Sequence, residues 1–566
     1  MGTKIDTGRN AIGYAASGRA IALLCVPALA LSAQAALGQT ETGVNEQTTI
    51  DRDRVDRRAP QVSLPPAGAE APQGSVEVAP GAGGAENVRL ARVRYEGSTL
   101  PAETLNAATA PYIGQPLTRE NLQKIANAVS AAYAASDIAF YGVSIPAQAP
   151  TGGELTLRVL EGRIVRYTLA KETPSMPTRL IRKTVQHLLD ETPAHRSTIE
   201  RTLSLLRDIP GQTVDAQIKR TGVPGELVLD LDVKRNQIEL SLNVNNRGVT
   251  NVISGVQTQV GVAVNGLLRE GDSTRISAYL PLHPDRYQYY SAVHSTPIGA
   301  NGTRLSFNGA YVRTLTQNNI RGTAKLAGIT LSHPLIRSYK RNLTLSVGLD
   351  GTNSDNYFLD TQFGGFKTRA LRFSGAWSSV GKKGGYAASL TLTQGIDGLG
   401  AEPFVGYSEA GFRKANLQLA AVQKFGERVT LRGGILGQYS NDLLPTTERF
   451  SMGGPGGGAA FNQGVVTAES ALSGNIELSC KAFGPAASSL GVSLFGFADG
   501  GIGRSLARPA YLIPERSYSL ASAGFGVRIS PAKGWVGSAQ LAFPVKSPLP
   551  NLQNDTRFLF SISKVL

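Results

Sequence analysis

The chain has 566 residues, of which 41% are hydrophobic and 17% charged, with 64 glycines and a formal net charge of +15. This length allows several domains, and the low charge with abundant glycine is unlike a chain built on one large soluble core. The lysines and arginines are scattered rather than clustered, which argues against a nucleic-acid-binding protein and favours a basic lumen or contact with anionic lipid.

Residues 1–35 have the pattern of a secretory signal peptide. Basic residues precede an apolar run from Ala20 to Leu31, and the small residues Ala33 and Ala35 follow it. The run is too short to span a membrane as a helix, and no longer apolar run occurs downstream. Once this segment is removed, only Cys480 remains of the two cysteines, so no internal disulfide is expected.

Residues 36–87 differ in composition from the rest of the chain. Charges of both signs alternate at 51–58, and a stretch rich in Pro, Ala and Gly follows. This pattern predicts a short polar helix, which could plug a pore, and then a linker. A disordered tail without a role is the alternative.

Two small α+β domains are predicted next, at 88–166 and 167–235. Each combines strands of alternating character with helices that have one apolar face. In the first domain, one helix and one strand carry the apolar residues Leu122, Ile125, Val129, Leu155, Leu157 and Val159. The second domain repeats the pattern, with helices predicted at 180–189 and 199–206.

From residue 236 to residue 566, strand alternation replaces helical periodicity. Residues 238–245 and 343–350 alternate strictly between apolar and polar. Alternation alone also fits a soluble sandwich, but the length of this region suits a transmembrane antiparallel β-barrel of about 16 strands. Turn signals at 300–302 and 334–338 fall between the periodic segments, and the aromatic final strand is typical of an inserted barrel. The predicted fold class is therefore mostly β.

Motifs for chemistry are weak throughout the chain. The glycine-rich residues 453–458 lack the Gly-Lys-Ser/Thr ending of a phosphate-binding loop, so a flexible loop is the better interpretation. The five histidines have no metal-ligand spacing, and no Gly-x-Ser-x-Gly elbow occurs. We therefore expect no metal, no cofactor, no nucleic-acid partner and no enzymatic activity.

Five segments together resemble the haemolysin-activator family, the transporters of two-partner secretion. They are residues 155–164 (preceded by 145–148), 199–211, 245–248, 334–338 and 449–455. The first two resemble parts of the polypeptide-transport-associated (POTRA) domains of that family, the third the start of its barrel, the fourth a turn, and the last a long loop. Each segment alone is weak evidence for the family, but all five follow one another in the same order as in the family. The resemblance covers essentially residues 88–566.

The resemblance implies a 16-stranded barrel in the outer membrane, in contact with its lipids, with two POTRA domains in the periplasm. It implies a monomer that recognises a large secreted exoprotein, of adhesin or haemolysin type, and exports it without ATP. The six apolar residues of the first domain are then candidates for client binding. A barrel-assembly or insertion factor, with three to five POTRA domains, and a passive porin, with none, are the alternatives.

The resemblance also implies contact between a loop that folds into the lumen and the barrel wall. The loop motif is Gly453, Gly454, Ala459 and Phe461, and the wall motif is Phe497, Asp499 and Gly501. In the family a loop arginine reaches the wall aspartate, but here Ala459 takes its place. Arg449 or Arg504 as substitutes, a hydrated lumen, and altered transport are the alternatives. We expect a looser loop, held by Phe461 packing and backbone contacts.

Overall fold

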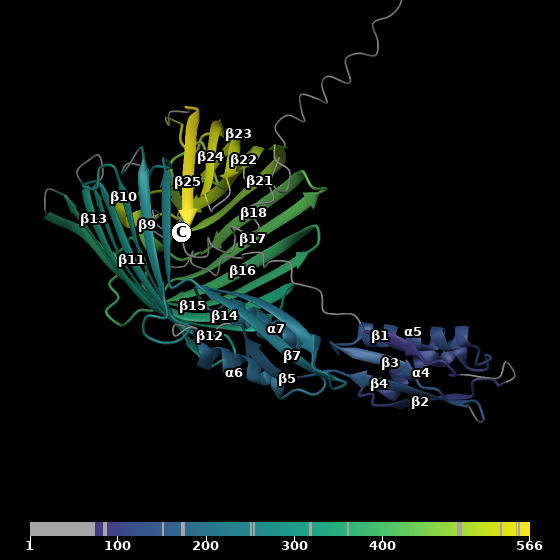
Figure 1. Cartoon of the computed structure of the whole chain (residues 1–566). Coiled ribbons are helices and arrows are strands. Elements are labelled where there is room, and N and C mark those ends of the chain that lie inside the picture. Colours follow the sequence, from purple (N-terminus) through teal and green to yellow (C-terminus); the bar gives the residue numbers. More distant parts are fainter. Residues whose placement is uncertain are drawn as a thin grey trace, which may run out of the picture.

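The computed structural model describes residues 74–82, 88–149, 152–170, 176–249, 252, 255–315, 320–358, 361–483, 490–531, 535–550, 552 and 555–565. The expected signal peptide at 1–35 and the expected polar helix at 51–58 lie outside these residues. Along the chain follow two small α+β units and then a large barrel (Figure 1).

The first unit is a four-stranded sheet with two helices packed on it. Its strands follow the spatial order β1 (Ser75–Val78), β3 (Tyr141–Ile145), β4 (Glu154–Glu161) and β2 (Arg92–Glu96). The helices are α4 (Ala102–Thr109) and α5 (Arg119–Ala135), with the short turn η3 (Ala110–Tyr112) between them. Helix α5 begins where expected, because the Thr118 side chain accepts a hydrogen bond from the Asn121 amide at 3.3 Å.

Two elements of this unit differ from the sequence analysis. Strand β1 lies in the range assigned to the linker, so the sheet starts before Val88. This strand pairs in parallel with β3, and its own four residues do not reveal that pairing. Helix α4 was not predicted, because its eight residues are too few for a clear helical period and bury only Leu105 and Thr109.

The second unit is a three-stranded sheet covered by two helices. The strand order is β5 (Arg163–Leu169), β7 (Glu226–Arg235) and β6 (Gln212–Arg220). The helices are α6 (Thr178–Leu189) and α7 (Arg196–Arg207), as the apolar spacing predicts. Their apolar faces and the inner side of β7 form one hydrophobic core.

Sixteen strands of the described residues close into an antiparallel barrel, which confirms the expected fold class and strand number. The strands are β8 (Ile238–Asn245), β9 (Gln257–Asn265), β10 (Ser273–Pro281), β11 (Tyr287–Ile298), β12 (Thr303–Leu315), β13 (Ile320–Arg337), β14 (Arg341–Phe358), β15 (Thr361–Gly381), β16 (Gly384–Gly395), β17 (Arg413–Phe425), β18 (Val429–Tyr439), β21 (Ser470–Phe483), β22 (Leu490–Ser505), β23 (Arg516–Pro531), β24 (Trp535–Lys546) and β25 (Arg557–Val565). Short elements η4 (Thr446–Glu448), β19 (Phe450–Met452), β20 (Val466–Ala468) and η5 (Pro509–Tyr511) lie in the loops. Across the described ranges, no helix is both long and apolar enough to cross a membrane.

Alternation decides which side chains face outward on the barrel. Large apolar side chains such as Ile329, Leu390 and Ile562 are exposed on the outer surface, where lipid would cover them. The segment 334–338 is not a turn as predicted. Strand β13 continues to Arg337, because a bulge between Pro334 and Ile336 takes up the proline and leaves only residues 338–340 for the turn.

One of the resemblance segments lies at the junction between the first and the second unit. Gly162 connects the first unit to the second: its amide donates to the Phe140 carbonyl at 2.9 Å, and its carbonyl accepts from the Ala194 amide at 2.9 Å. A Cβ on Gly162 would stand 2.7 Å from Phe140 Cβ, so this close approach requires glycine.

The second unit docks on the turns at one end of the barrel. Arg201 of α7 donates to the carbonyls of Pro334 and Leu335 at 3.0 and 3.2 Å. Arg337 forms a bidentate pair with Asp208, with N–O distances of 2.6 and 2.5 Å. The segments 199–211 and 334–338, far apart in the sequence, therefore meet in space, and the sheet of the second unit stands at the barrel mouth (Figure 1).

Candidate functional site in the barrel lumen

A long loop between β18 and β21, residues 440–469, packs against the inner wall of the barrel. Its two arms form a small ladder in which β19 pairs with β20. Between them the chain turns at the expected loop motif, and Phe461 is buried. Phe461 belongs to one hydrophobic cluster with Leu520, Ala542 and Leu559, which face the lumen from β23, β24 and β25. Packing of Phe461, as expected, thus contributes to the loop's position.

Glycines allow the tip of this loop to approach the wall. Gly453 and Gly454 have φ angles of +93° and +81°, and a Cβ on Gly453 would lie 2.4 Å from the Asn462 carbonyl oxygen. At Gly458, a Cβ would lie 2.4 Å from Leu520 Cδ1. On the wall, Gly501 and Gly503 leave room for Met452 of the loop, because a Cβ on Gly503 would lie 2.7 Å from its sulfur.

The wall carboxylate of Asp499 binds the loop through a backbone amide. The Ala459 amide lies 3.0 Å from Oδ2 and 3.2 Å from Oδ1, and the Ser522 hydroxyl also donates to Oδ1. The amide of Ala460 donates to the Ser522 oxygen at 3.3 Å. The loop and wall motifs are therefore in contact, and backbone amides stand where the family resemblance implies an arginine.

Neither of the two arginines considered as substitutes reaches Asp499. Arg449 Nε lies 2.9 Å from Glu469 Oε1, and its Nη2 donates to Ser505. Arg504 pairs with Glu515 at 2.8 Å in an exposed position. Phe497, the remaining member of the wall motif, is partly buried beside Phe495, with 6.3 Å between the ring centroids.

Two clusters of buried charges hold the loop at its base rather than at its tip. In the first, Glu448 of the loop lies 2.9 Å from Arg372 Nη2 of β15 and 2.8 Å from Lys414 Nζ of β17. Arg372 also pairs with Asp350 of β14 at 2.6 Å. The Lys414 ammonium donates in addition to the Glu448 carbonyl at 2.8 Å. Two barrel strands thus bind one loop residue, and a third strand is joined to it through Arg372.

The second cluster centres on Glu469, where the loop returns to β21. Its carboxylate lies 2.9 Å from Arg449 Nε and 2.7 Å from Arg508 Nη2. The amide of Leu506 donates to its other oxygen at 3.0 Å. The guanidinium of Arg508 also stacks on the Tyr407 ring, 4.4 Å from its centroid. Adjacent loops are thereby tied to the base of the inward-folded loop.

These base contacts are the strongest candidates for holding the loop. Glu448 and Glu469 are 2% and 0% exposed, so removing one member would upset the balance of charge in a cluster that is out of water. The sequence analysis missed both clusters, because their members come from strands far apart in the chain. The one available signal was the presence of the charged residues Asp350, Arg372 and Lys414 at positions whose alternation points them into the lumen.

The six apolar residues proposed for client binding do not lie on a surface. Leu122, Ile125, Val129, Leu155, Leu157 and Val159 are between 0% and 5% exposed and form the core of the first unit. The helix is buried as expected, but these side chains cannot touch a client in the folded unit, so their assignment as a binding surface is corrected. Apolar spacing identified the packing face of the helix.

Beside this core, one polar cluster fixes the end of β4. The Glu161 carboxylate accepts hydrogen bonds from the Tyr133 hydroxyl at 2.6 Å and from the Thr99 amide at 2.8 Å. Burial, followed by the hydrogen bond to Glu161, raises the pKa of the Tyr133 hydroxyl. Glu161 therefore has a structural role. Among the residues that the structure describes, no group of three or more His, Cys, Asp or Glu side chains is arranged to hold a metal ion.

A closed 16-stranded barrel with a loop folded onto its inner wall, preceded by two small α+β units of which the second docks at its mouth, is the architecture of an outer-membrane transport barrel. Comparisons with known proteins agree. The family model "Haemolysin secretion/activation protein ShlB/FhaC/HecB" matches residues 225–529, and the model "POTRA domain, ShlB-type" matches residues 88–162. The chain belongs to the haemolysin secretion/activation family, the outer-membrane transporters of two-partner secretion.

Individual relatives are distant in sequence but similar in length. The outer membrane transporter CdiB of Escherichia coli is 23% identical over 456 residues, covering 77% of this chain and 74% of its own. The heme/hemopexin transporter protein HuxB of Haemophilus influenzae is 22% identical over 483 residues, covering 80% and 82%. The solved structure of CdiB from Escherichia coli matches with a TM-score of 0.70 at 19% identity, over 95% of this chain and 99% of that one.

Proposed function

We propose that this protein exports a large secreted partner protein across the outer membrane, after its two POTRA domains have captured that partner in the periplasm. The observation that carries the proposal is the docking of the second POTRA domain on the barrel turns through Arg201 and the Asp208–Arg337 pair. Export needs a domain that captures the client at the mouth of the lumen. It also needs a lumen that a loop closes through contacts that can be broken. A passive porin has no use for this arrangement, and an assembly factor would carry three to five such domains.

Export in this proposal needs no ATP. An unfolded client that folds outside the cell leaves the equilibrium on the periplasmic side, which draws further chain through the lumen. The inward-folded loop is held by contacts that can be exchanged for contacts with a client: backbone amides on Asp499 and ion pairs at Glu448 and Glu469. The client is expected to be an adhesin-like or haemolysin-like exoprotein.

Client capture is assigned to an edge strand rather than to the buried apolar residues. Among the strands of the described residues, β6 pairs only with β7, so its other side offers backbone groups to an extended chain. It starts at the barrel mouth, where a Cβ on Gly211 would lie 2.2 Å from the Asn236 carbonyl oxygen, and it runs outward to Arg220. A client strand added along β6 would therefore lead towards the lumen.

Site-specific photo-crosslinking tests this assignment in the full chain. A benzophenone side chain at Gln217, exposed on β6, should crosslink to the secreted partner during export. The same group at Gln123, exposed on α5 of the first unit, is the matched control and should crosslink far less. Equal crosslinking at both positions, or none at Gln217 while the partner is exported, would remove β6 as the capture strand.

A further inference from the structure

A row of positive charges crosses the outer surface of the barrel at the end opposite the POTRA domains. Lys325 on β13 and Lys367 on β15 both lie opposite Asn353 on β14, one on each side of it. Neighbouring strands are about 4.8 Å apart, so the two lysine backbones are separated by roughly 10 Å. Arg369 follows two residues after Lys367 on the same face and donates to Asn353 Oδ1 at 2.9 Å. Arg313 of β12 extends the row.

These side chains point outward, as the alternation of the strands requires. Lys325 lies an even number of residues from the exposed Ile329 and Leu331, so it points to the same face of β13. Lys367 and Arg369 lie an even number of residues from the exposed Phe373 on β15. The outer face of β13 exposes Leu335, Leu331 and Ile329, with His333 among them, and this stretch ends before Lys325. Lys325 stands four residues beyond Ile329, about 13 Å along the strand, at the level expected for headgroups.

Acidic residues near the row balance only part of its charge. Lys367 pairs with Glu402 at 2.6 Å, and Asp355 lies on the same face, where it accepts from Gln362 at 3.0 Å. Within the described residues, Arg313 and Lys325 have no acidic partner within ion-pair distance. Four cations against two carboxylates leave an excess positive charge on a face that lipid surrounds. Such an excess attracts phosphate groups.

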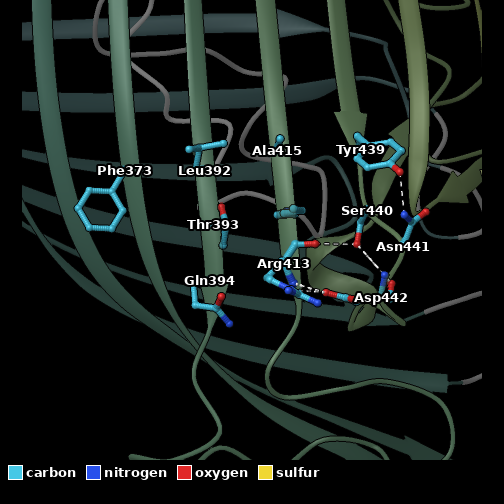
Figure 2. Close-up of a pocket in the computed structure, with 11 residues that line it drawn as sticks. Phe373, Leu392, Thr393, Gln394, Arg413, Ala415, Tyr439, Ser440, Asn441 and Asp442 are labelled. Carbon is cyan, nitrogen blue, oxygen red and sulfur yellow. Dashed lines mark hydrogen bonds and ion pairs between the residues drawn. The ribbon is translucent and has the colours of Figure 1, made fainter.

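A hollow of about 440 Å³ opens beside this row on the same outer face. Figure 2 shows its lining, with Phe373, Leu392 and Tyr439 around it and Arg413 at its rim beside Asp442. Arg413 is 77% exposed, and its Nε lies 3.5 Å from Asp442 Oδ2. Phe373 stands four residues from Arg369 along β15, so the hollow continues from the cations towards the membrane interior.

We propose that this face binds a phosphorylated glycolipid of the outer leaflet, of the lipid A type. Its phosphates lie against Lys325, Lys367 and Arg369, and one acyl chain enters the hollow at Phe373. The spread of cations over adjacent strands suits a headgroup that carries two phosphates separated by a disaccharide. The leaflet assignment rests on the orientation in the proposed function, with the POTRA domains in the periplasm, whereas the binding itself can be measured without export.

Native mass spectrometry of the full chain in phosphatidylcholine nanodiscs, titrated with diphosphoryl lipid A, tests the proposal. The variant Lys325→Gln/Lys367→Gln should bind this lipid about tenfold more weakly, since each lysine near an anionic surface contributes measurably to the attraction. The control Lys383→Gln/Lys424→Gln removes two charges from the turns at the POTRA end and should bind like the wild type. Ala415→Trp, which fills the hollow without a change of charge, should also weaken binding.

Heat-modifiable migration on gels shows that each variant is folded before its binding is compared. Lipid A without its phosphates should bind the wild type no more tightly than diphosphoryl lipid A binds the lysine variant. Equal lipid A affinity for the wild type and the lysine variant, or an equal loss in the control, would overturn the proposal. Competition by inorganic phosphate at similar concentration would overturn it as well, because the site would then be one for free phosphate. Loss of lipid binding with intact export, or the reverse, separates this proposal from the proposed function.

Discussion

Substitution of Glu448 by glutamine should release the inward-folded loop more than any change at its tip. Glu448 is buried between Arg372 Nη2 at 2.9 Å and Lys414 Nζ at 2.8 Å. Arg372 keeps Asp350 in the variant, but the Lys414 ammonium, which is 0% exposed, loses its carboxylate. The docked loop then covers a cation that has lost its ion pair with Glu448, whereas the undocked loop lets water reach it.

The size of the effect follows from the cost of a broken buried ion pair. Removing one partner of such a pair costs about 3 to 5 kcal/mol, which lowers the ratio of docked to undocked loop by roughly 150-fold or more. Asp499→Asn removes a charged acceptor of hydrogen bonds, worth about 1.5 to 3 kcal/mol, or roughly 10- to 150-fold. The base of the loop should therefore control its position more than the tip.

Single-channel conductance in planar bilayers measures this difference. Glu448→Gln should give a larger and more frequent open state than Asp499→Asn. The exposed Glu515→Gln, whose partner Arg504 is solvated, should match the wild type. Lys414→Met combined with Glu448→Gln removes both members of this ion pair and should restore much of the closed state. A larger conductance in Asp499→Asn than in Glu448→Gln, or no recovery in the double variant, would refute the reasoning.

Three further variants test other contacts. Ala459→Arg should leave conductance within about twofold of the wild type, because overpacking at a buried alanine costs about 1 to 3 kcal/mol and offsets the new ion pair with Asp499. Adding Asp499→Asn to this variant should then raise conductance. An unchanged conductance in the double variant would contradict the pairing. Arg201→Ala should raise hydrogen exchange in α7 about tenfold, unlike the exposed Arg182→Ala, and equal exchange in both would rule out docking through Arg201. Asn246→Ala, which removes bonds to Phe558 and Phe560 across the β8–β25 seam, should lower the unfolding temperature of the barrel by a few degrees, whereas Asn441→Ala should not.

The parts of the fold that depend on local periodicity could be predicted from the sequence. Alternation located the barrel from residue 236 onwards, and apolar spacing located α5, α6 and α7, because these signals lie within a few residues of one another. Strand β1 could not be found this way, since its partner β3 follows more than sixty residues later. Pro334 was misread as a turn because a bulge, which depends on the neighbouring strand, accommodates it.

The site was predictable only in outline. The resemblance brought the loop near Ala459 and the wall near Asp499 together, and the structure joins them through a backbone hydrogen bond. The charges around Glu448 come from β14, β15 and β17, and no pattern along the chain connects them. For Leu122 and its neighbours, a helical period shows that a face is buried but not what covers it; here the sheet of the same unit does.

Export of a partner is the central claim, and it can be measured directly in cells that produce this protein. The partner to co-express is to be sought among the proteins encoded beside it, as a large, signal-bearing and repeat-rich chain. The account predicts that this partner reaches the cell surface or the medium only when the folded, heat-modifiable barrel with its POTRA domains is present. Retention of the partner in the periplasm, although the intact barrel is in the outer membrane, would contradict the account.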